Sequence, residues 1–249
     1  MSKNISRISL LGVPVDVVDW PAALDAVAAL IHRDGPPATV IAINPEKVMA
    51  ANKDPRLLKQ ISEAGLLIPD GVGVVWASRF LGMGHMERVP GSEMMPAICA
   101  LAAEQGFKVF LFGAKEETNA RCVETLKQTY PGLQVAGRQN GYVDETAMPE
   151  LISRINASGA QILFVALGSP RQELWMETNL PKLNVKVCQG VGGTFDVIAG
   201  NVKRAPAVFR ALNLEWFYRL VTNPSRAGRQ KVLPVFAWRV IKSKWLAKG

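Results

Sequence analysis

The sequence predicts an α/β protein built around a largely parallel sheet. Between residues 108 and 188, apolar segments of strand length recur about every 25 residues, separated by segments with the amphipathic pattern of a helix. Strands that are apolar along their whole length and joined by helices are typical of a parallel sheet covered on both faces. We therefore expect a doubly wound, Rossmann-like domain, followed by a basic helical C-terminal appendage.

The N-terminal elements follow from turn and cap signals. Residues 7–18 predict two short β segments around a turn at Gly12, and Asn44, followed by proline, is a typical helix cap. In order, the expected elements are a helix from Pro21 to about His32, a strand Thr39–Ile43, a helix capped by Asn44, a helix from Pro55 to Gly65, a strand ending at Pro69, a helix from Gly73 to about Leu81 and a helix capped by Ser92 that runs to about Gln105.

From Lys108 the pattern becomes a regular alternation of strand and helix. The expected strands are Val109–Phe112, Leu133–Ala136, Ile162–Leu167 and Val185–Cys188. The expected helices are Lys115–Thr129, Met148–Ser158 and Gln172–Asn179. After residue 200 the alternation stops, and two helical segments are expected, one from Arg204 through Tyr218 and one over residues 231–247.

Charge divides the chain at about residue 200. The net charge is +8, yet residues 201–249 hold eleven Lys and Arg against the single acid Glu215. We therefore predict a catalytic domain over residues 1–200 and a basic appendage over residues 201–249, which points to an anionic partner. In the last helix, Trp238 and Trp245 alternate with cations, a pattern that fits either a membrane-surface helix or the solvated face of a helix docked on the domain.

Several classes of protein are disfavoured. No apolar run approaches the roughly 20 residues of a spanning helix. Cys99, Cys122 and Cys188 lie in apolar or amphipathic segments and are expected to be buried free thiols. His32 and His85 are not at metal-ligand spacing, so no metal site is predicted. The phosphate and dinucleotide loops of P-loop and NAD enzymes are missing, and no cofactor is expected.

Polar residues cluster where predicted strands end. The clusters are Asn44 with Glu46, Asp70, residues 113–115, residues 168–173 and residues 190–196. Strand ends of a parallel sheet meet at one edge, so these clusters are expected to line one crevice. Asp70 follows an apolar strand and precedes Gly-Val-Gly, which permits either a helix cap or a carboxylate facing the crevice.

Taken together, the motifs resemble a known family. From about Leu11 to the C-terminus, the sequence is similar to the WecG/TagA/CpsF glycosyltransferases, glycosyltransferase family 26. The stretches that carry the resemblance are Asn44-Pro45-Glu46, Pro69-Asp70-Gly71, residues 87–91, residues 164–173, residues 190–200, residues 203–206 and residues 214–220.

The resemblance implies an inverting transferase. Such an enzyme moves N-acetylmannosamine, its uronic acid or glucose from a UDP-sugar to an undecaprenyl-diphosphate-linked saccharide, without a required metal. It implies a cytoplasmic protein, peripheral on the inner face of the bacterial plasma membrane. Which sugar is transferred, and whether the chain forms a homo-oligomer, is left open.

The resemblance also implies roles for individual residues. The family's base falls on Asp70, and its pocket residues fall on Asn44, Arg88 and Gln172. The arginines of its appendage, which engage the lipid diphosphate, fall on Arg219, Arg226 and Arg229. The chain departs from some members at Ala42, where they carry a hydroxyl, so a role for that hydroxyl is not carried over.

The chemistry of the residues agrees with these roles. An inverting transfer needs a base for the acceptor hydroxyl and cations or amides for the leaving diphosphate. Asp70 can supply the base. Substrate-binding candidates are the helix starts after Gly113 and Gly168, the glycine turn at Gly192 and Gly193, and Arg88 or Arg171. The alternatives are a nucleotide- or nucleic-acid-binding module that uses the basic tail, and a soluble sugar-nucleotide enzyme whose tail mediates oligomerisation. No nucleic-acid motif is recognised.

Overall fold

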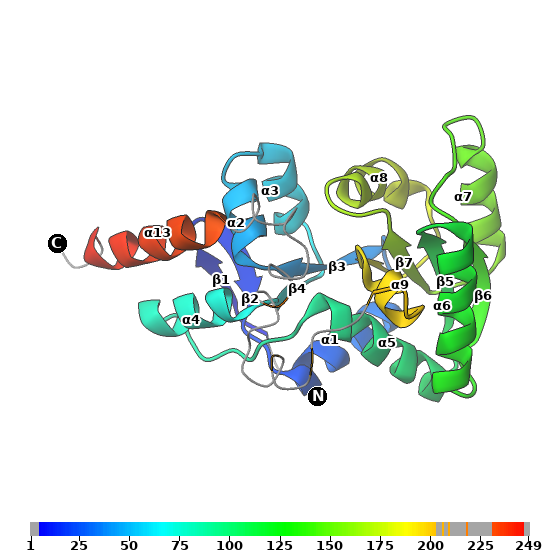
Figure 1. The fold of residues 1–249 in the computed structure, drawn as a ribbon, viewed down its shortest axis with the longest axis horizontal. Helices are drawn as coiled ribbons and strands as arrows, with labels where there is room; N and C mark the ends of the chain where they lie inside the picture. Colours follow the sequence, from blue (N-terminus) through cyan, green and yellow to red (C-terminus); the bar gives the residue numbers. More distant parts are fainter. Residues whose placement is uncertain (1–4, 203–205, 207–208, 210–217, 219–230, 247–249) are drawn as a thin grey trace.

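A computed structural model of the protein describes residues 5–202, 206, 209, 218 and 231–246 (Figure 1). Its centre is a six-stranded sheet in which all neighbouring strands are parallel, in the order β4-β3-β8-β7-β5-β6. The strands are β3 (Ala38–Ile43), β4 (Leu66–Pro69), β5 (Lys108–Gly113), β6 (Gln134–Gln139), β7 (Ile162–Ala166) and β8 (Val187–Gly190). The predicted α/β fold with a parallel sheet is confirmed.

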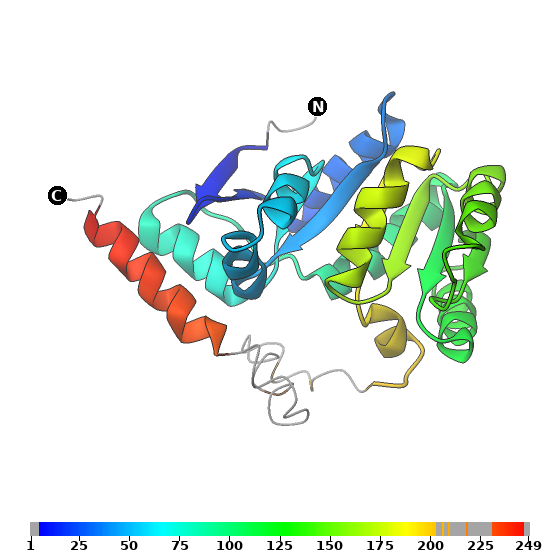
Figure 2. The ribbon, with the colours of Figure 1, turned by 90° about the horizontal axis from the view of Figure 1, so that it is seen from above.

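Helices cover both faces of this sheet. Figure 1 shows α3 and α8 on one side of the strands and α1 and α5 on the other, and Figure 2 shows the same layers from above. The helices are α1 (Trp20–His32), α2 (Pro45–Ala51), α3 (Pro55–Ser62), α4 (Val72–Leu81), α5 (Gly91–Gln105), α6 (Glu116–Thr129), α7 (Met148–Ala157), α8 (Arg171–Asn179), the 3-10 turn η1 (Leu180–Lys182), α9 (Thr194–Ile198) and α13 (Val232–Leu246).

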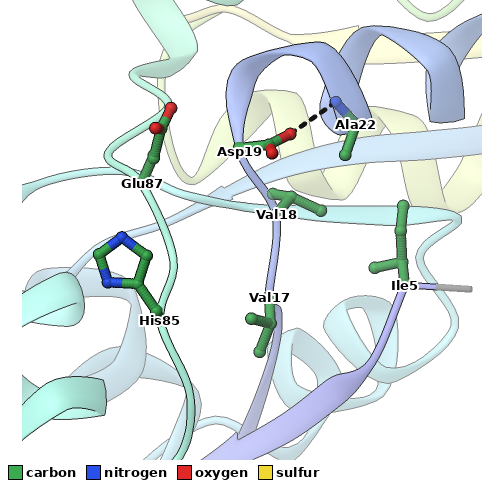
Figure 3. Close-up of a pocket in the computed structure, with 7 residues that line it drawn as sticks. All are labelled: Ile5, Val17, Val18, Asp19, Ala22, His85 and Glu87. Atoms are coloured by element: carbon green, nitrogen blue, oxygen red, sulfur yellow. Dashed lines mark hydrogen bonds between the residues drawn. The ribbon is translucent and has the colours of Figure 1, made fainter. Parts of the chain in front are cut away.

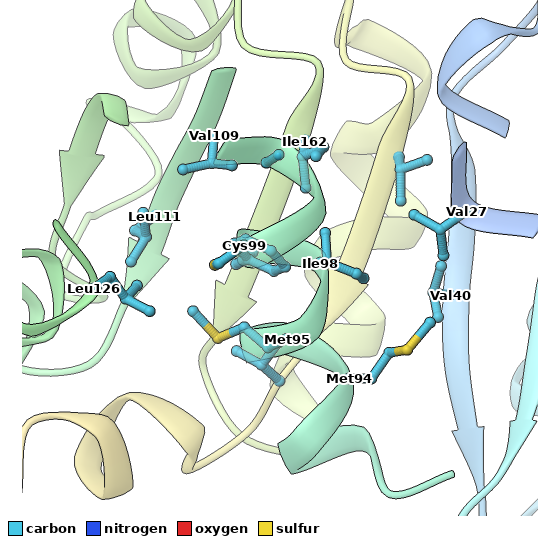
Figure 4. Packing of buried hydrophobic residues seen from close by; sticks show 14 of the residues in the cluster. Val27, Val40, Met94, Met95, Ile98, Cys99, Val109, Leu111, Leu126 and Ile162 are labelled. Carbon is cyan, nitrogen blue, oxygen red and sulfur yellow. The ribbon is translucent and has the colours of Figure 1, made fainter. Parts of the chain in front are cut away.

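The core follows from the alternation of side chains along the strands. Val40, Gln189 and Phe164 lie side by side on neighbouring strands and face α1 and α5. Figure 4 shows part of this cluster, with Ile98 and Cys99 of α5 packed against the strands. The residues one position away, such as Ile41 and Leu163, face the opposite side, where α2, α3, α7 and α8 cover them.

Several boundaries differ from the sequence prediction. β6 spans Gln134–Gln139 instead of Leu133–Ala136, and α3 ends at Ser62 instead of Gly65. β8 spans Val187–Gly190 instead of Val185–Cys188, because the strand is paired on both sides and this pairing overrides the weak strand preference of Gln189 and Gly190. α5 begins at Gly91 with Pro90 at its N-cap, so Ser92 lies in the first turn and is not the cap. The expected helix over residues 204–218 falls almost entirely outside the described residues.

A two-stranded hairpin, β1 (Arg7–Leu10) and β2 (Val13–Asp16), lies beside the edge strand β4. Asp16 connects the two. Its buried carboxylate, 2% exposed as a residue, accepts hydrogen bonds from the Leu67 amide at 2.8 Å and from Arg7 Nε at 2.7 Å. Arg7 also donates to the Ala64 carbonyl oxygen at 3.1 Å. The hairpin therefore satisfies a backbone donor that the sheet edge leaves unpaired.

Replacing this carboxylate should destabilise the whole domain. We expect Asp16→Ala to lower the free energy of unfolding by about 2–3 kcal/mol, because it leaves the buried Leu67 amide and the partly buried Arg7 guanidinium without their hydrogen-bond acceptor. Urea unfolding followed by circular dichroism measures the difference. Asp34→Ala is the control, since Asp34 is exposed and lies 3.9 Å from Lys186. Equal midpoints for both variants contradict the assigned role of Asp16.

Candidate functional site

The turns that follow the parallel strands meet at one edge of the sheet, as predicted. The central neighbours at this edge are β3 and β8. The chain leaves β3 for α2, which packs with Ile41 and Ile43 on one face, and leaves β8 for α9, whose Phe195 packs on the opposite face. Neighbouring connections that depart to opposite faces mark the point at which ligands bind in sheets of this kind, so the crevice expected between them is the candidate site.

Asp70 lies directly after β4 at this edge. Its amide donates to the Ile43 carbonyl oxygen at 2.8 Å, which holds the ends of β3 and β4 together. The N-cap of α4 is Gly71, in a conformation with φ 100° that favours glycine, and the helix begins at Val72. Asp70 is thus not the capping residue. Its Oδ2 atom lies 3.9 Å from the position that a Cβ on Gly91 would occupy. The carboxylate therefore lies beside the start of α5.

Arg88 belongs to the segment that leads into α5. Backbone hydrogen bonds hold this segment in place, from Val89 to the Pro69 carbonyl oxygen at 2.8 Å and from Glu87 to the Val18 carbonyl oxygen at 3.0 Å. The Arg88 guanidinium lies 3.8 Å from Glu93 Oε1, beyond hydrogen-bond distance. Within the described residues it makes no hydrogen bond, so its donors are available to an anionic ligand.

Asn44 has a structural role that also leaves one group available. As predicted, it is the N-cap of α2, and its Oδ1 accepts a hydrogen bond from the Lys47 amide at 2.8 Å. Its Nδ2 group donates no hydrogen bond within the described residues. Its Cβ lies 4.0 Å from the Cβ position of Gly71, so the turns after β3 and β4 touch.

Gln172 is buried, and both ends of its amide bind protein groups. Its Oε1 accepts from the Gly192 amide at 2.9 Å, and its Nε2 donates to Glu173 Oε1 at 3.3 Å. Gln172 therefore links α8 to the turn after β8. The second N–H of Nε2 donates no hydrogen bond within the described residues.

Lys47 and Glu173 complete this cluster. Glu173 belongs to the predicted polar cluster of residues 168–173, but the sequence analysis gave neither residue a role of its own. Lys47 Nζ lies 2.8 Å from Glu173 Oε1, and the Glu173 side chain is only 6% exposed. Burial by itself raises the pKa of this carboxyl, but the Lys47 ammonium and the hydrogen bonds outweigh it and hold the pKa below its usual range. For Lys47, its place one turn into the helix after Asn44 was the available signal.

The glycine positions differ in what they can contribute. Gly113 is buried with φ 127°, and a Cβ there would lie 2.4 Å from the Ala166 carbonyl oxygen, so it serves the close approach of two strand ends. The first turn of the adjacent α6 carries Glu116 and Glu117, which disfavour an anion there. At Gly168, Gly192 and Gly193, by contrast, a Cβ would meet nothing within 4 Å, so these turns are open.

The remaining predicted residues are placed as follows. Arg171, at the first position of α8, is exposed and beside the open Gly168 turn. Arg219, Arg226 and Arg229 lie outside the described residues. The three cysteines are buried free thiols, as predicted, and burial raises the pKa of Cys122 to about 12, with a smaller effect of Asp196. In the described part of the chain, no group of His, Cys, Asp and Glu has the arrangement of a metal site.

A pocket elsewhere on the molecule is a weaker candidate. It has a volume of about 210 Å³ and is lined by Ile5, Val17, Val18, Asp19, Ala22, His85 and Glu87 (Figure 3). Its carboxylates already have structural partners, since Asp19 caps α1 through the Ala22 amide at 2.8 Å and Glu87 accepts from the Trp20 amide at 3.4 Å. None of its residues belongs to a turn that follows a strand of the six-stranded sheet, and it is smaller than typical ligand pockets.

The helix α13 lies beside α2 and α4 (Figures 1 and 2). Phe236 and Val240 are buried against the domain, and Lys244 Nζ donates to the Phe80 carbonyl oxygen and lies 4.0 Å from the centre of its ring. Trp238 and Trp245 point away and are 64% and 76% exposed. The helix is therefore docked, as one of the two readings of its sequence predicted, and also presents an aromatic outer face. No helix within the described ranges is long and apolar enough to cross a membrane.

Comparison with known proteins identifies the family. The sequence profile described as the Glycosyl transferase WecG/TagA/CpsF family matches residues 8–249. The chain belongs to this family. It is therefore a glycosyltransferase, and the WecG/TagA/CpsF assignment favours this activity over a nucleic-acid-binding module.

Individual relatives of this WecG/TagA/CpsF glycosyltransferase carry a more specific name. A protein of Bacillus subtilis (strain 168) is 37% identical over 208 residues, which cover 83% of this chain and 80% of the relative. A protein of Staphylococcus aureus (strain MRSA252) is 34% identical over 245 residues, which cover 97% and 94%. Both are named N-acetylglucosaminyldiphosphoundecaprenol N-acetyl-beta-D-mannosaminyltransferase.

The two kinds of glycine predict opposite outcomes. Gly113→Ala should lower the free energy of unfolding by about 3 kcal/mol, because the added Cβ collides with backbone that cannot move aside. Gly193→Ala should leave the urea midpoint unchanged, since the position has ordinary φ and open space. Similar midpoints for the two variants contradict the assigned role of Gly113.

The buried carboxylate of Glu173 predicts a pH dependence of stability. Because its pKa is lowered in the folded state, its contribution is present above the ordinary pKa of about 4.3 and is lost as the pH falls through the folded value. The difference in unfolding free energy between wild type and Glu173→Gln should therefore be largest near neutral pH and shrink below about pH 5. Glu177→Gln, on the exposed side of α8, is the control. A difference that does not change between pH 7 and 3 contradicts the lowered pKa.

Proposed function

We propose that this glycosyltransferase transfers N-acetylmannosamine from UDP-N-acetylmannosamine to N-acetylglucosaminyl-diphosphoundecaprenol. The observation that carries the proposal is the shared name of relatives that are 34–37% identical over most of the chain. Among the donors left open by the sequence, it favours N-acetylmannosamine over the uronic acid and glucose. A panel of the three UDP-sugars with a short-chain lipid-diphosphate acceptor tests it, and turnover with another donor alone contradicts it.

In the proposed reaction, Asp70 is the base. It takes the proton of the acceptor hydroxyl as that oxygen attacks the anomeric carbon, while the bond between this carbon and the UDP oxygen breaks. Its place at a strand end, half-buried and near the start of α5, supports the role.

The leaving UDP requires compensation of its negative charge. We assign this to Arg88, which has unengaged donors, and to Arg171 with the amides of the open turns at Gly168 and Gly193. Asn44 and Gln172 border the same crevice, and each keeps an N–H for the donor. In this assignment, cationic side chains and backbone amides stabilise the negative charge of the leaving diphosphate, as a metal ion does in other glycosyltransferases.

The acceptor is a membrane lipid, so the enzyme must work at a membrane surface. We propose that the outer face of α13 rests on the anionic inner leaflet through Trp238 and Trp245, with Arg239 and Lys242 near the headgroups. Residues 201–249 then form the membrane-associating appendage, and Arg219, Arg226 and Arg229 are assigned to the lipid diphosphate. The protein is peripheral in this proposal.

Removing the base should abolish chemistry but spare binding. We expect Asp70→Asn to reduce turnover about 10²–10⁴-fold, the usual contribution of general base catalysis, while UDP affinity changes little. Steady-state kinetics and calorimetric titration with UDP separate the two effects. Asp34→Asn controls for the change of charge, because Asp34 is exposed and lies in the loop between α1 and β3. Turnover within a few-fold of wild type rules out Asp70 as the base.

Membrane association should depend on the two exposed tryptophans. The double change Trp238→Ser, Trp245→Ser should reduce flotation with vesicles containing anionic lipid by about tenfold or more, because each large apolar side chain contributes on the order of 1.5–3 kcal/mol when buried. Tyr142→Ser is the matched control, since Tyr142 is an exposed aromatic residue between β6 and α7. Flotation that is equally strong in all three proteins contradicts the proposed surface.

A further inference from the structure

The ion pair of Lys47 and Glu173 joins two helices that cover the same face of the sheet. Lys47 extends from α2, which follows β3, and Glu173 from α8, which follows β7. Between these strands lies β8. The pair is 2.8 Å long, with the side chains only 15% and 6% exposed, so it lies over the end of β8 and is shielded from water.

Stability alone does not explain a buried ion pair. Removing two charges from water is costly, and apolar residues of similar size are often equally stabilising. The cost is greater here because Glu173 Oε2 is buried and accepts no hydrogen bond within the described residues. A charged pair at this position therefore calls for a role that an apolar pair cannot fill.

The charge of Glu173 determines the orientation of the Gln172 amide. An ionised carboxylate only accepts hydrogen bonds, so Gln172 must turn its Nε2 toward Glu173 and its Oε1 toward the Gly192 amide. If the Gln172 amide were flipped, its oxygen would face the Glu173 carboxylate and its NH₂ group would face the Gly192 N–H. There is little space to escape this, since a Cβ on Gly190 would lie 2.7 Å from Gln172 Nε2.

The turn at Gly192 and Gly193 depends on this orientation. Gly192 has φ 55°, and no side chain lies within 4 Å of a Cβ built at either glycine. Two side-chain hydrogen bonds fix the turn: Thr194 Oγ1 donates to the Val191 carbonyl oxygen at 2.6 Å within it, and the Gly192 amide donates to Gln172 Oε1 at 2.9 Å, which connects it to α8. This same turn borders the crevice assigned to the leaving diphosphate.

We infer that Lys47 and Glu173 are positioning residues for donor binding: their ion pair sets the Gln172 amide, which holds the Gly192–Gly193 turn in the shape that binds the UDP moiety. This inference rests on the proposed function, because it requires a UDP-sugar in the crevice. The two residues touch neither the donor nor the acceptor.

The test compares stability, UDP affinity and the exchange of the Gly192 amide. Glu173→Gln and Lys47→Met should each weaken UDP binding about tenfold in calorimetric titration and raise the donor KM, with kcat changed less than about twofold. Hydrogen exchange of a peptide that contains Gly192 should become faster in both. Lys47→Arg keeps the cation and should restore UDP affinity and protection.

The double variant Lys47→Met, Glu173→Gln separates positioning from stability. It removes both buried charges, so its urea midpoint should recover relative to the single variants. UDP affinity and Gly192 protection should not recover, because no carboxylate remains to orient Gln172. We expect the double variant to fold even where a single variant does not. Its UDP affinity therefore decides between a positioning role and a purely structural one. Glu177→Gln is the matched control, because Glu177 also connects α8 to another helix but does so on the exposed side, where it accepts from Gln60 of α3 at 3.0 Å.

Two results overturn the inference alone. One is a double variant that regains UDP affinity together with stability. The other is a wild-type protein that binds UDP and transfers sugar while Glu173→Gln and Lys47→Met retain its UDP affinity and Gly192 exchange. A wild-type protein that binds no UDP overturns the proposed function and, with it, this inference.

Discussion

The parallel pairing of β3 with β8 is the contact on which the rest of the molecule depends. Ala38 is opposite Val187, so β3, from the first part of the chain, pairs with β8, the strand of the sheet that comes last in the sequence. Because the chain leaves these two strands toward opposite faces, their pairing creates the crevice and brings together turns that are far apart in sequence. Asn44 and Gly192 come to one edge of the sheet only through this long-range contact, whose closure is costly in chain entropy.

Local sequence was sufficient for most of the fold. Period, caps and glycine breaks predicted the parallel sheet and nearly every described helix, because these signals act within a few residues. The errors occurred where tertiary contacts decide. β8 extends through Gln189 and Gly190 because neighbours on both sides pair with it, and α5 starts at Gly91, where the preceding segment is held by β4. Neither cause is visible in the local sequence.

The candidate site was predictable in position and only partly in detail. Strand-end geometry placed Asp70, Asn44 and Gln172 at one edge, but it gave no means to tell a glycine in an open turn from Gly113, which is needed for close backbone contact. The ion pair of Lys47 and Glu173 spans 126 positions of sequence, and no motif signals such a partnership. Only the folded chain brings α2 and α8 close enough for the two side chains to meet.

The packing of α13 on α4 fixes the position of Asp70 relative to the outer face of α13. α4 begins two residues after Asp70, and at 1.5 Å per residue it extends about 15 Å. Phe236 lies near Gly73 at the start of α4, while Lys244 contacts Phe80 near its end, so the two helices run side by side in the same direction. In the proposed membrane-bound form, α13 lies along the lipid surface and α4 lies parallel to it. The packing of the two helices then holds the base, which precedes α4, at one height above the lipid, and this height limits the number of sugars that can separate an acceptor hydroxyl from its lipid.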